Sequence, residues 1–281
     1  MGKVLARASP ATFYSYEPLH MYGVRILDQD SEDLRYALVL MKDLMRCRLQ
    51  KHPDQVSHMG RQDFYFQQNT FLNNLCRRDN GMYSCKNATY VGEVCGSAEL
   101  HVVKVLRLSL KWVRPLLENS DLDFQVIYLA RDPRAVLSSR VKEDWCTPSC
   151  QNPERMCSLL AEDLREAVLL EKEYPSRFKF IKYDEVCDNP LASLKTVMSF
   201  LNLPVTKPQE VILPSRKIGQ NDKEIFSRAD LWRRRSSFTQ IVKPVQNYCR
   251  SSLEKLGLRI FVSEQDLHDL SIPTLSGPSG L

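Results

Sequence analysis

The sequence lacks the marks of several large protein classes. No apolar run is long enough to span a membrane or to form the core of a signal peptide. No G-x-x-x-x-G-K-[ST] stretch occurs, which argues against a P-loop kinase or NTPase. The cysteines do not fall into the closely spaced pairs of a zinc site, and no other metal ligands stand at a convincing spacing. We therefore expect a chain that works without a bound metal.

A strong basic footprint is also missing. The formal net charge is only +5, and the basic residues are spread apart from Arg77–Arg78 and Arg233–Arg235. No nucleic-acid recognition motif occurs, so we expect no nucleic-acid partner. At 281 residues the chain is long enough for one large domain with a full core. A mildly basic surface suits an enzyme that handles anionic ligands.

Cysteine, in contrast, is abundant. Nine cysteines without a zinc pattern favour disulfide bonds formed in an oxidising lumen. Their connectivity stays open, and the odd number leaves at least one thiol unpaired or bound to another chain. Asn87-Ala88-Thr89 is a glycosylation acceptor sequence, which weakly supports the same compartment. We therefore expect a lumenal protein.

Residues 124–140, FQVIYLARDPRAVLSSR, hold the most informative pattern. The apolar run 126–130 predicts a buried strand, and Asp132 with Pro133 predicts the start of a helix. Ligands of open α/β folds bind at such strand ends, where a helix N-terminus attracts anions. Arg131 adds a planar donor for phosphate or sulfate, and Ser139 adds a hydroxyl. The alternative is an ordinary turn with a structural Arg131–Asp132 or Arg134–Asp pair.

The segment LARDPRAVLSSR resembles the 3′-phosphate-binding segment of carbohydrate sulfotransferases. The closest resemblance is to the Golgi family that sulfates the 6-hydroxyl of N-acetylglucosamine, galactose or N-acetylgalactosamine, and it runs from about Phe13 to Phe261. In that family an arginine and a serine at these positions hold the 3′-phosphate of 3′-phosphoadenylyl sulfate (PAPS). The resemblance implies this role for Arg131 and Ser139, with Arg134 as a neighbouring donor, and it implies PAPS as co-substrate without a metal.

The resemblance also implies the fold. We expect an α/β, P-loop-NTPase-like three-layer fold with a mostly parallel central sheet. The segment FYSYEPLHMYG, residues 13–23, is similar to one that follows the first helix in the family. The family's preceding strand and its phosphosulfate loop, R-[ST]-G-S-[ST]-F, are missing here. We therefore expect a single domain over residues 1–265 that is truncated at its N-terminus, and a disordered tail over residues 266–281.

Periodicity predicts further elements along the chain. Residues 100–108 and 178–183 are expected to form buried strands, and residues 53–98 are expected to form an irregular insertion held by disulfides. A disulfide is also expected in the loop that starts at Trp145. Helices are expected over residues 31–50, 109–119, 153–174 and 191–203.

Sulfuryl transfer also needs a base and partners for developing charge. Glu17 is the candidate base because of its place in the resembling segment, and His20 is the runner-up because it titrates near neutral pH. A buried structural carboxylate is the alternative for Glu17. Lys104 and Arg107 could face an anion from a strand end, or lie on a solvated edge.

The segment WRRRSSFTQ, which starts at Trp232, resembles the family's chain just before the last helix. The resemblance implies that Trp232 packs on the donor nucleotide and that Arg233 or Arg235 meets phosphate. A solvated basic turn is the alternative.

The expected function is transfer of a sulfuryl group from PAPS to a sugar hydroxyl, at the 6-position, of a glycan or glycosaminoglycan. The alternative is a non-catalytic lumenal protein that keeps the fold and binds a glycan or a partner. By resemblance, the expected location is the Golgi lumen or membrane, with a membrane anchor in the full-length protein. We also expect the chain to form a homodimer.

Overall fold

The computed structural model describes residues 1–61, 63–79, 81–119, 121–213 and 227–276. The chain forms two compact units. Unit 1 comprises Met1–Asp123 and Leu203–Ile212, and unit 2 comprises Phe124–Asn202 and Leu213–Leu281. Within the described residues, each unit holds one pair of parallel strands, where the sequence predicts a single sheet. The prediction of a single domain stays a prediction.

Unit 1 is built around the parallel strands β1 and β2. Its α-helices and strands are α1 (Gly2–Leu5), β1 (Thr12–Tyr16), α2 (Glu32–Met45), α3 (Pro53–Arg61), α4 (Asp63–Gln68), α5 (Thr70–Asp79), α6 (Ala88–Gly96), β2 (Leu100–Lys104), α7 (Arg114–Leu117) and α12 (Lys207–Val211). Its 3₁₀ helices are η1 (His20–Tyr22), η2 (Leu49–Lys51), η3 (Gly81–Lys86) and η4 (Leu110–Trp112).

Strand β1 is an element that the sequence did not predict. The segment FYSY follows α1 and forms a buried strand, which pairs with β2 in the register Thr12↔Leu100 to Tyr16↔Lys104. Strand β2 ends at Lys104, earlier than predicted, and is half-buried along its length. The register brings Glu17 and Lys104 to the same end of the pair.

Helix α2 begins as the sequence predicts. The Ser31 side chain accepts a hydrogen bond from the Leu34 backbone N–H at 3.2 Å, as an N-cap does. The helix ends at Met45, five residues before the predicted end at residue 50. Cys47 has a φ of 55°, a left-handed conformation that an α-helix excludes. The apolar face of α2 packs into the core through Leu34, Leu40 and Leu44.

The prediction that residues 53–98 are irregular is wrong. The described part of this segment folds into α3, α4, α5, η3 and α6. The expected disulfides are present, since Cys76 pairs with Cys85 and Cys47 with Cys95. Helices of ten residues or fewer are weak on their own, so packing and cross-links are needed to stabilise them.

Unit 2 contains the opening strand and most of the long helices. Its α-helices and strands are β3 (Val126–Ala130), α8 (Pro133–Arg140), α9 (Pro153–Glu173), β4 (Phe178–Lys182), α10 (Tyr183–Asp188), α11 (Pro190–Phe200), α13 (Lys243–Tyr248), α14 (Arg250–Lys255) and α15 (Glu264–His268). It also holds the 3₁₀ helices η5 (Arg228–Asp230) and η6 (Arg233–Arg235) and the π-helix η7 (Phe238–Val242).

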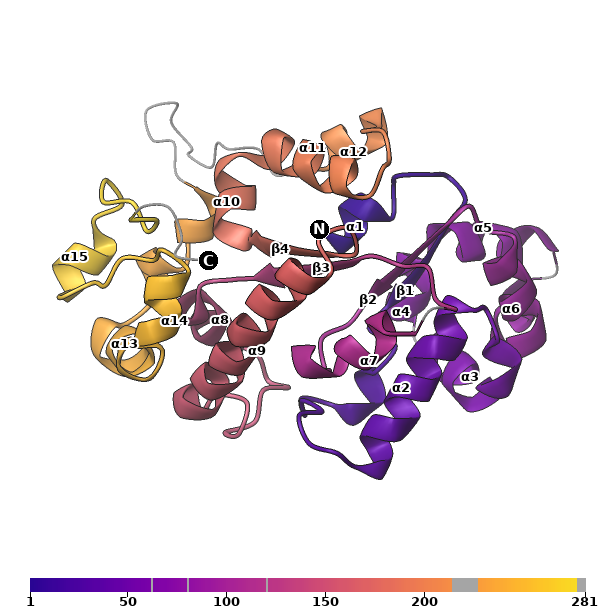
Figure 1. Cartoon of the computed structure of the whole chain (residues 1–281), viewed down its shortest axis with the longest axis horizontal. Helices are drawn as coiled ribbons and strands as arrows, with labels where there is room; N and C mark the ends of the chain where they lie inside the picture. Colours follow the sequence, from indigo (N-terminus) through magenta and orange to yellow (C-terminus); the bar gives the residue numbers. More distant parts are fainter. Residues whose placement is uncertain (62, 80, 120, 214–226, 277–281) are drawn as a thin grey trace. The chain divides into compact units, whose positions relative to one another are not determined.

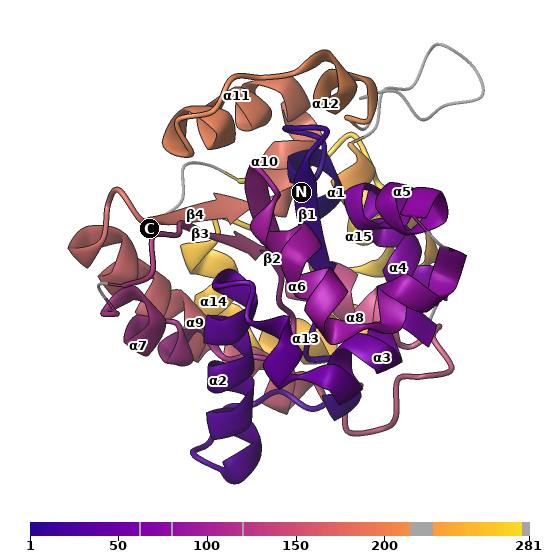
Figure 2. The same cartoon turned by 90° about the vertical axis from the view of Figure 1, so that its right-hand side faces the viewer.

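Strands β3 and β4 form the centre of unit 2. They run parallel in the register Val126↔Phe178 to Ala130↔Lys182, as the predicted spans require. Helices α9 and α14 lie on one side of the pair, and α10 and α11 lie on the other (Figures 1 and 2). The core joins the strand, α9 and the C-terminal helices through Ala130, Leu164, Val245 and Leu253. Strand β3 is half-buried before Ala130, whereas the sequence predicts burial on both faces.

The expectation of a disordered tail from Asp266 is corrected over the described residues. Helix α15 includes Asp266, and Leu275 forms an antiparallel bridge with Leu258. Leu267 and Thr274 are buried. Polar composition suggested disorder, but this segment is held through its backbone carbonyls by a buried arginine described below. Residues 277–281 of the expected tail lie outside the described residues.

Candidate functional site: the turn between β3 and α8

The turn after β3 has the cap that the sequence predicts. Strand β3 ends at Ala130, and α8 starts at Pro133, the first helical position. The Asp132 carboxylate accepts a hydrogen bond from the Arg134 backbone N–H at 2.8 Å. Asp132 is fully buried, so this N-cap is part of the framework of the turn. Arg131 lies between the strand and the cap.

Arg134 is a structural residue in this arrangement. Its side chain has no exposed surface, and Nη2 donates to Asp132 Oδ2 at 2.8 Å. Nη1 donates to Gln246 Oε1 at 2.9 Å and to the Arg259 carbonyl at 2.6 Å. These partners occupy the Arg134 guanidinium inside the core of unit 2. The interpretation of Arg134 as a residue that binds the PAPS nucleotide is therefore corrected in favour of the Arg134–Asp pair.

Arg131 has a different environment. The register Ala130↔Lys182 places Arg131 beside Tyr183, the residue that follows β4. The guanidinium carbon of Arg131 lies 4.8 Å from the centre of the Tyr183 ring, in cation–π contact. Its Nε is buried and has no hydrogen-bond partner within the described residues. A buried donor without a partner is costly, and an anionic ligand would satisfy it.

Tyr183 was missed as a site residue by reasoning from the sequence. The segment that begins at Tyr183 reads as a structural one, and only the pairing of β3 with β4 shows that the ring supports Arg131. Burial, with a hydrogen bond to Cys187, raises the pKa of Tyr183. Tyr183 therefore stays neutral near pH 7 and offers an uncharged face to the cation. The strand register could have been anticipated only from a correct sheet topology.

Two serines near the end of α8 have different surroundings. Ser139 is exposed, so its hydroxyl is open to a ligand. Ser138 is buried and accepts a hydrogen bond from Ser236 Oγ. Of this pair, only Ser139 keeps the accessibility that the predicted phosphate contact requires.

An acidic side chain lies beside the cap. Burial raises the pKa of Asp184 to about 7, and the nearby Asp132 carboxylate adds to this shift. Below that pH Asp184 is mostly neutral, because burial disfavours the charged form. The protein thereby limits the negative charge next to the turn.

Trp232 and Arg233 do not have the roles that the resemblance implies. Trp232 is only 7% exposed and packs edge-on against Phe261, with ring centres 6.4 Å apart. Arg233 is fully buried and donates to the backbone carbonyls of Leu267, Asp269 and Ile272 at 2.8, 2.6 and 2.7 Å. Both side chains belong to the core of unit 2. The alternative of a solvated turn is also wrong for these two residues, although Arg235 is exposed.

Glu17 lies at the end of β1 in unit 1, where it binds two cations. Its Oε1 accepts from Lys104 Nζ at 2.8 Å, and its Oε2 accepts from Arg107 Nη1 at 2.9 Å. Lys104 also lies 4.2 Å from the centre of the Tyr16 ring. Glu17 has a φ of 49°, an uncommon conformation for a residue with a side chain. The carboxylate and both cations therefore form one cluster at the strand ends.

The charge state of Glu17 follows from these contacts. Burial alone would raise the pKa of Glu17, but the hydrogen bonds from Lys104 and Arg107 outweigh it and hold the pKa below its ordinary value. The group is thus ionised at neutral pH and is a weak base. His20 lies nearby, and its Nδ1 is 3.1 Å from the Glu17 carbonyl oxygen.

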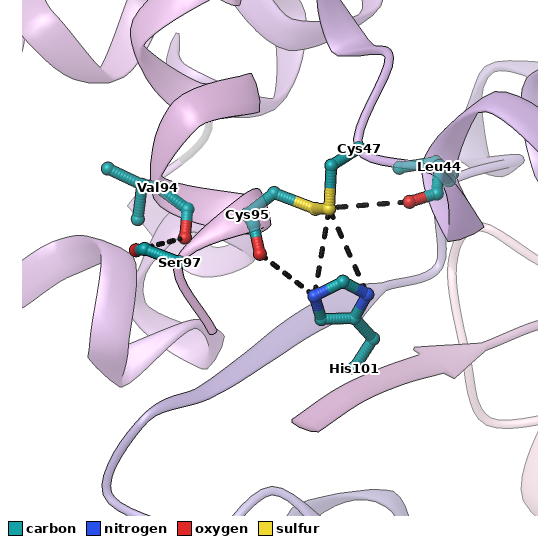
Figure 3. The surroundings of a disulfide bond; sticks show 6 residues. All are labelled: Leu44, Cys47, Val94, Cys95, Ser97 and His101. Atoms are coloured by element: carbon teal, nitrogen blue, oxygen red, sulfur yellow. Dashed lines mark hydrogen bonds between the residues drawn. A yellow bond between two sulfur atoms is a disulfide. The ribbon is translucent and has the colours of Figure 1, made fainter. Parts of the chain in front are cut away.

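The one Cys/His group in the described residues that could hold a metal consists of Cys47, Cys95 and His101. The two cysteines are joined in a disulfide, and the imidazole lies against it (Figure 3). His101 Nε2 is 3.6 Å from Cys47 Sγ and donates to the Cys95 carbonyl at 2.8 Å. Metal-binding cysteines are thiolates, so the disulfide form does not supply these ligands.

Two further disulfides lie in unit 2. Cys146 pairs with Cys150, which confirms the expected disulfide loop, and Cys157 pairs with Cys249. Cys187 is a buried free thiol. Among the described helices, none combines the length and the apolar composition that a membrane crossing requires.

Comparison with known proteins agrees with the resemblance. Carbohydrate sulfotransferase 3 of Mus musculus is 26% identical over 215 residues, which cover 67% of this chain and 45% of that protein. Carbohydrate sulfotransferase 1 of Danio rerio is 25% identical over 213 residues, 66% of this chain and 50% of that protein. Carbohydrate sulfotransferase 6 of Homo sapiens is 24% identical over 224 residues, 69% of this chain and 56% of that protein.

The chain spans about half the length of these curated relatives. The family model of the sulfotransferase domain matches residues 57–255 of this chain. This range includes the β3–α8 turn and both strands of unit 2. This match covers more than half of the sequence. The chain therefore belongs to the sulfotransferase domain family.

Proposed function

We propose that this chain belongs to an enzyme that transfers the sulfuryl group of PAPS to a sugar hydroxyl, at the 6-position, of a glycan or glycosaminoglycan. The observation that carries the proposal is Arg131. Its guanidinium rests on Tyr183 at the carboxyl ends of two parallel strands, and its buried Nε lacks a partner within the described residues. This environment suits a phosphate group, as the family membership implies.

In the proposed reaction, the sugar oxygen bonds to sulfur while the bond from sulfur to the 5′-phosphate oxygen breaks. The products are the sulfated sugar and 3′,5′-ADP. Arg131 and the Ser139 hydroxyl would hold the 3′-phosphate, which lies on the part of the donor that does not react. Their contribution is to bind and orient the nucleotide.

The sugar hydroxyl must lose its proton during this step. Glu17 stays our candidate to accept it, with His20 as runner-up. The ion pairs with Lys104 and Arg107 keep Glu17 ionised, so it can accept a proton, but they also make it a weak base. The same contacts support a second role for Glu17, which is to hold Lys104 and Arg107 in place for an anionic ligand. The pH profile of turnover in Glu17→Gln separates the two roles, because only loss of the base abolishes the acidic limb.

Two measurements test the proposed function together. Calorimetry with 3′,5′-ADP tests the nucleotide site, and transfer of labelled sulfate from PAPS to glycan acceptors tests turnover. Binding with transfer is expected. Binding without transfer would instead favour a non-catalytic lumenal protein that binds a glycan or a partner. We also propose the Golgi lumen as its location, with a membrane anchor in the full-length protein, and a homodimer as its assembly.

A further inference from the structure

Trp145 is an exposed side chain that the donor site does not use. It is 58% exposed, whereas Trp232 is 7% exposed and packs in the core of unit 2. Water disfavours large apolar surfaces, and tryptophan is the residue that most often anchors a ligand or a partner when it is left exposed. Trp145 is therefore a candidate contact for a ligand.

The ring is held in a defined position. The next residue, Cys146, is cross-linked to Cys150 and donates its backbone N–H to the Glu143 carbonyl at 3.0 Å. The Gln151 side chain donates to the Cys146 carbonyl at 2.9 Å. The Trp145 indole N–H donates to Glu143 Oε2 at 3.1 Å. A ring that is already oriented loses little conformational entropy when it binds a ligand.

The loop that carries the exposed ring also carries polar side chains. Thr147 and Ser149 are exposed, and their hydroxyl oxygens lie 2.9 Å apart in the same loop. Together with the Glu143 carboxylate they supply donors and acceptors beside an apolar face. A sugar has the matching chemistry, with a face of C–H groups and an edge of hydroxyls. The Glu143 carboxylate accepts the indole N–H of Trp145, and a negative charge beside the ring favours a neutral sugar over a sulfated one.

Trp145 follows the C-terminal end of α8, whereas Arg131 precedes the N-terminal end of this eight-residue helix, which is about 12 Å long. Ser139 lies in the last turn of α8, so the separation applies to Arg131 and not to Ser139. We propose that Trp145 is a stacking platform for a neutral sugar residue of the acceptor glycan, at a subsite that does not include Arg131. The inference rests on the proposed function for the identity of the glycan as acceptor.

The experiment measures glycan binding and turnover separately. The probe is a tetrasaccharide of alternating galactose and N-acetylglucosamine, titrated by saturation-transfer NMR in the presence of 3′,5′-ADP. The variants are Trp145→Ala, Trp145→Phe and, as a matched control, Tyr248→Ala, which removes an aromatic ring that is 54% exposed in the same unit. We expect Trp145→Ala to raise the dissociation constant about tenfold and Trp145→Phe about threefold, with no change for Tyr248→Ala.

Affinity for 3′,5′-ADP should be unchanged in all three variants, and the KM for the glycan should rise without a fall in kcat, as expected for uniform binding energy. Equal tetrasaccharide affinity in wild type and Trp145→Ala would overturn the inference. So would a concentration-dependent dimer that only Trp145→Ala abolishes with glycan affinity intact, since Trp145 would then be a contact between copies.

The two proposals can fail separately. A wild-type chain that binds 3′,5′-ADP but not the tetrasaccharide refutes the sugar platform and leaves the donor site standing. A chain that binds the tetrasaccharide through Trp145 but not 3′,5′-ADP refutes the proposed transfer and supports the platform.

Discussion

Two arginines three residues apart show how surroundings decide the role of a side chain. Arg134 is enclosed by Asp132, Gln246 and a backbone carbonyl, so its charge serves the fold. Arg131 is held from one side by an aromatic ring and keeps an unsatisfied donor. Both have the same chemistry, and only the packing around them separates a structural ion pair from the proposed anion site.

Replacing Arg131 tests this distinction directly. Arg131→Ala should weaken 3′,5′-ADP binding by roughly 2–4 kcal/mol, because a charged hydrogen bond to phosphate in a partly buried site is lost. Calorimetry measures the affinity, and Arg250→Ala is the control, since Arg250 is an exposed arginine of the same unit. Unchanged affinity in Arg131→Ala would show that Arg131 is structural.

Glu17 makes a prediction about pH. Its depressed pKa means that the carboxylate stabilises the fold above about pH 4.5, and that this contribution is lost as pH falls through the folded-state pKa. Glu17→Gln should lower the free energy of unfolding at pH 7 by about 2 kcal/mol, less than for a fully buried pair because Lys104 is partly exposed. Urea unfolding at pH 7 and near pH 3 measures the difference.

The gap between wild type and Glu17→Gln should close toward pH 3. A gap that persists at low pH would mean that Glu17 acts through packing and not through its charge. Glu99→Gln is a suitable control, because it removes another carboxylate of unit 1 that lies outside this cluster.

At the scale of elements, the C-terminal segment depends on one side chain. Arg233 donates to carbonyls of Leu267, Asp269 and Ile272, and its guanidinium lies 4.5 Å from the centre of the Phe261 ring. Arg134 lies 4.9 Å from the same ring centre. The segment around α15 is thus bound to the core of unit 2 by buried cations.

Removing that anchor should be costly. Arg233→Ala should lower the free energy of unfolding by about 4 kcal/mol, because several buried carbonyls lose their donors. Arg233→Lys should recover only part of this, since an ammonium group cannot reproduce the planar fork. Arg235→Ala, an exposed neighbour in the same 3₁₀ helix, is the control in the same denaturation experiment. A loss below 1 kcal/mol in Arg233→Ala would contradict the role of Arg233.

The elements that could be predicted from the sequence share a physical property. Strand β3 and helix α9 have an apolar pattern that matches their period, and α2 and α8 begin at residues with capping side chains. Helices α5 and α6 also begin at capping side chains, Asn69 and Asn87, but helices α3 to α6 are short and lie in a segment that is cross-linked by the disulfides Cys47–Cys95 and Cys76–Cys85. A local sequence pattern predicts a local element, whereas the pairing of two distant cysteines cannot be predicted from such a pattern.

At the scale of the molecule, each disulfide joins two cysteines that belong to the same unit. Cys157–Cys249 closes 92 residues of chain in unit 2 and joins α9 to the residue between α13 and α14, while Cys146–Cys150 spans only 4. The loop-closure model assigns the long loop about 4.6 kcal/mol and the short one about 2 kcal/mol. The double variant Cys157→Ala/Cys249→Ala should therefore lose more stability than Cys146→Ala/Cys150→Ala in chemical unfolding. The reverse order would refute this account.

The same pairing fixes the number of thiols. The chain oxidised in a lumenal environment and unfolded without reductant should titrate one thiol, since Cys187 is the remaining cysteine. Alkylation and peptide mapping would identify it. Three or more thiols would show that a disulfide of the structure is not formed.

The sequence by itself determined the family and the strand–turn–helix at residues 124–140, because a strand, a cap and a helix start follow each other along the chain there. It also led to the proposal for Arg131. Only the tertiary structure decided which neighbouring side chains are available to a ligand. It paired β3 with β4 and so placed Tyr183 under Arg131, and it buried Arg134 and Arg233 among carbonyls and aromatic rings. Burial and strand register depend on residues far apart in the chain, and no short motif specifies them.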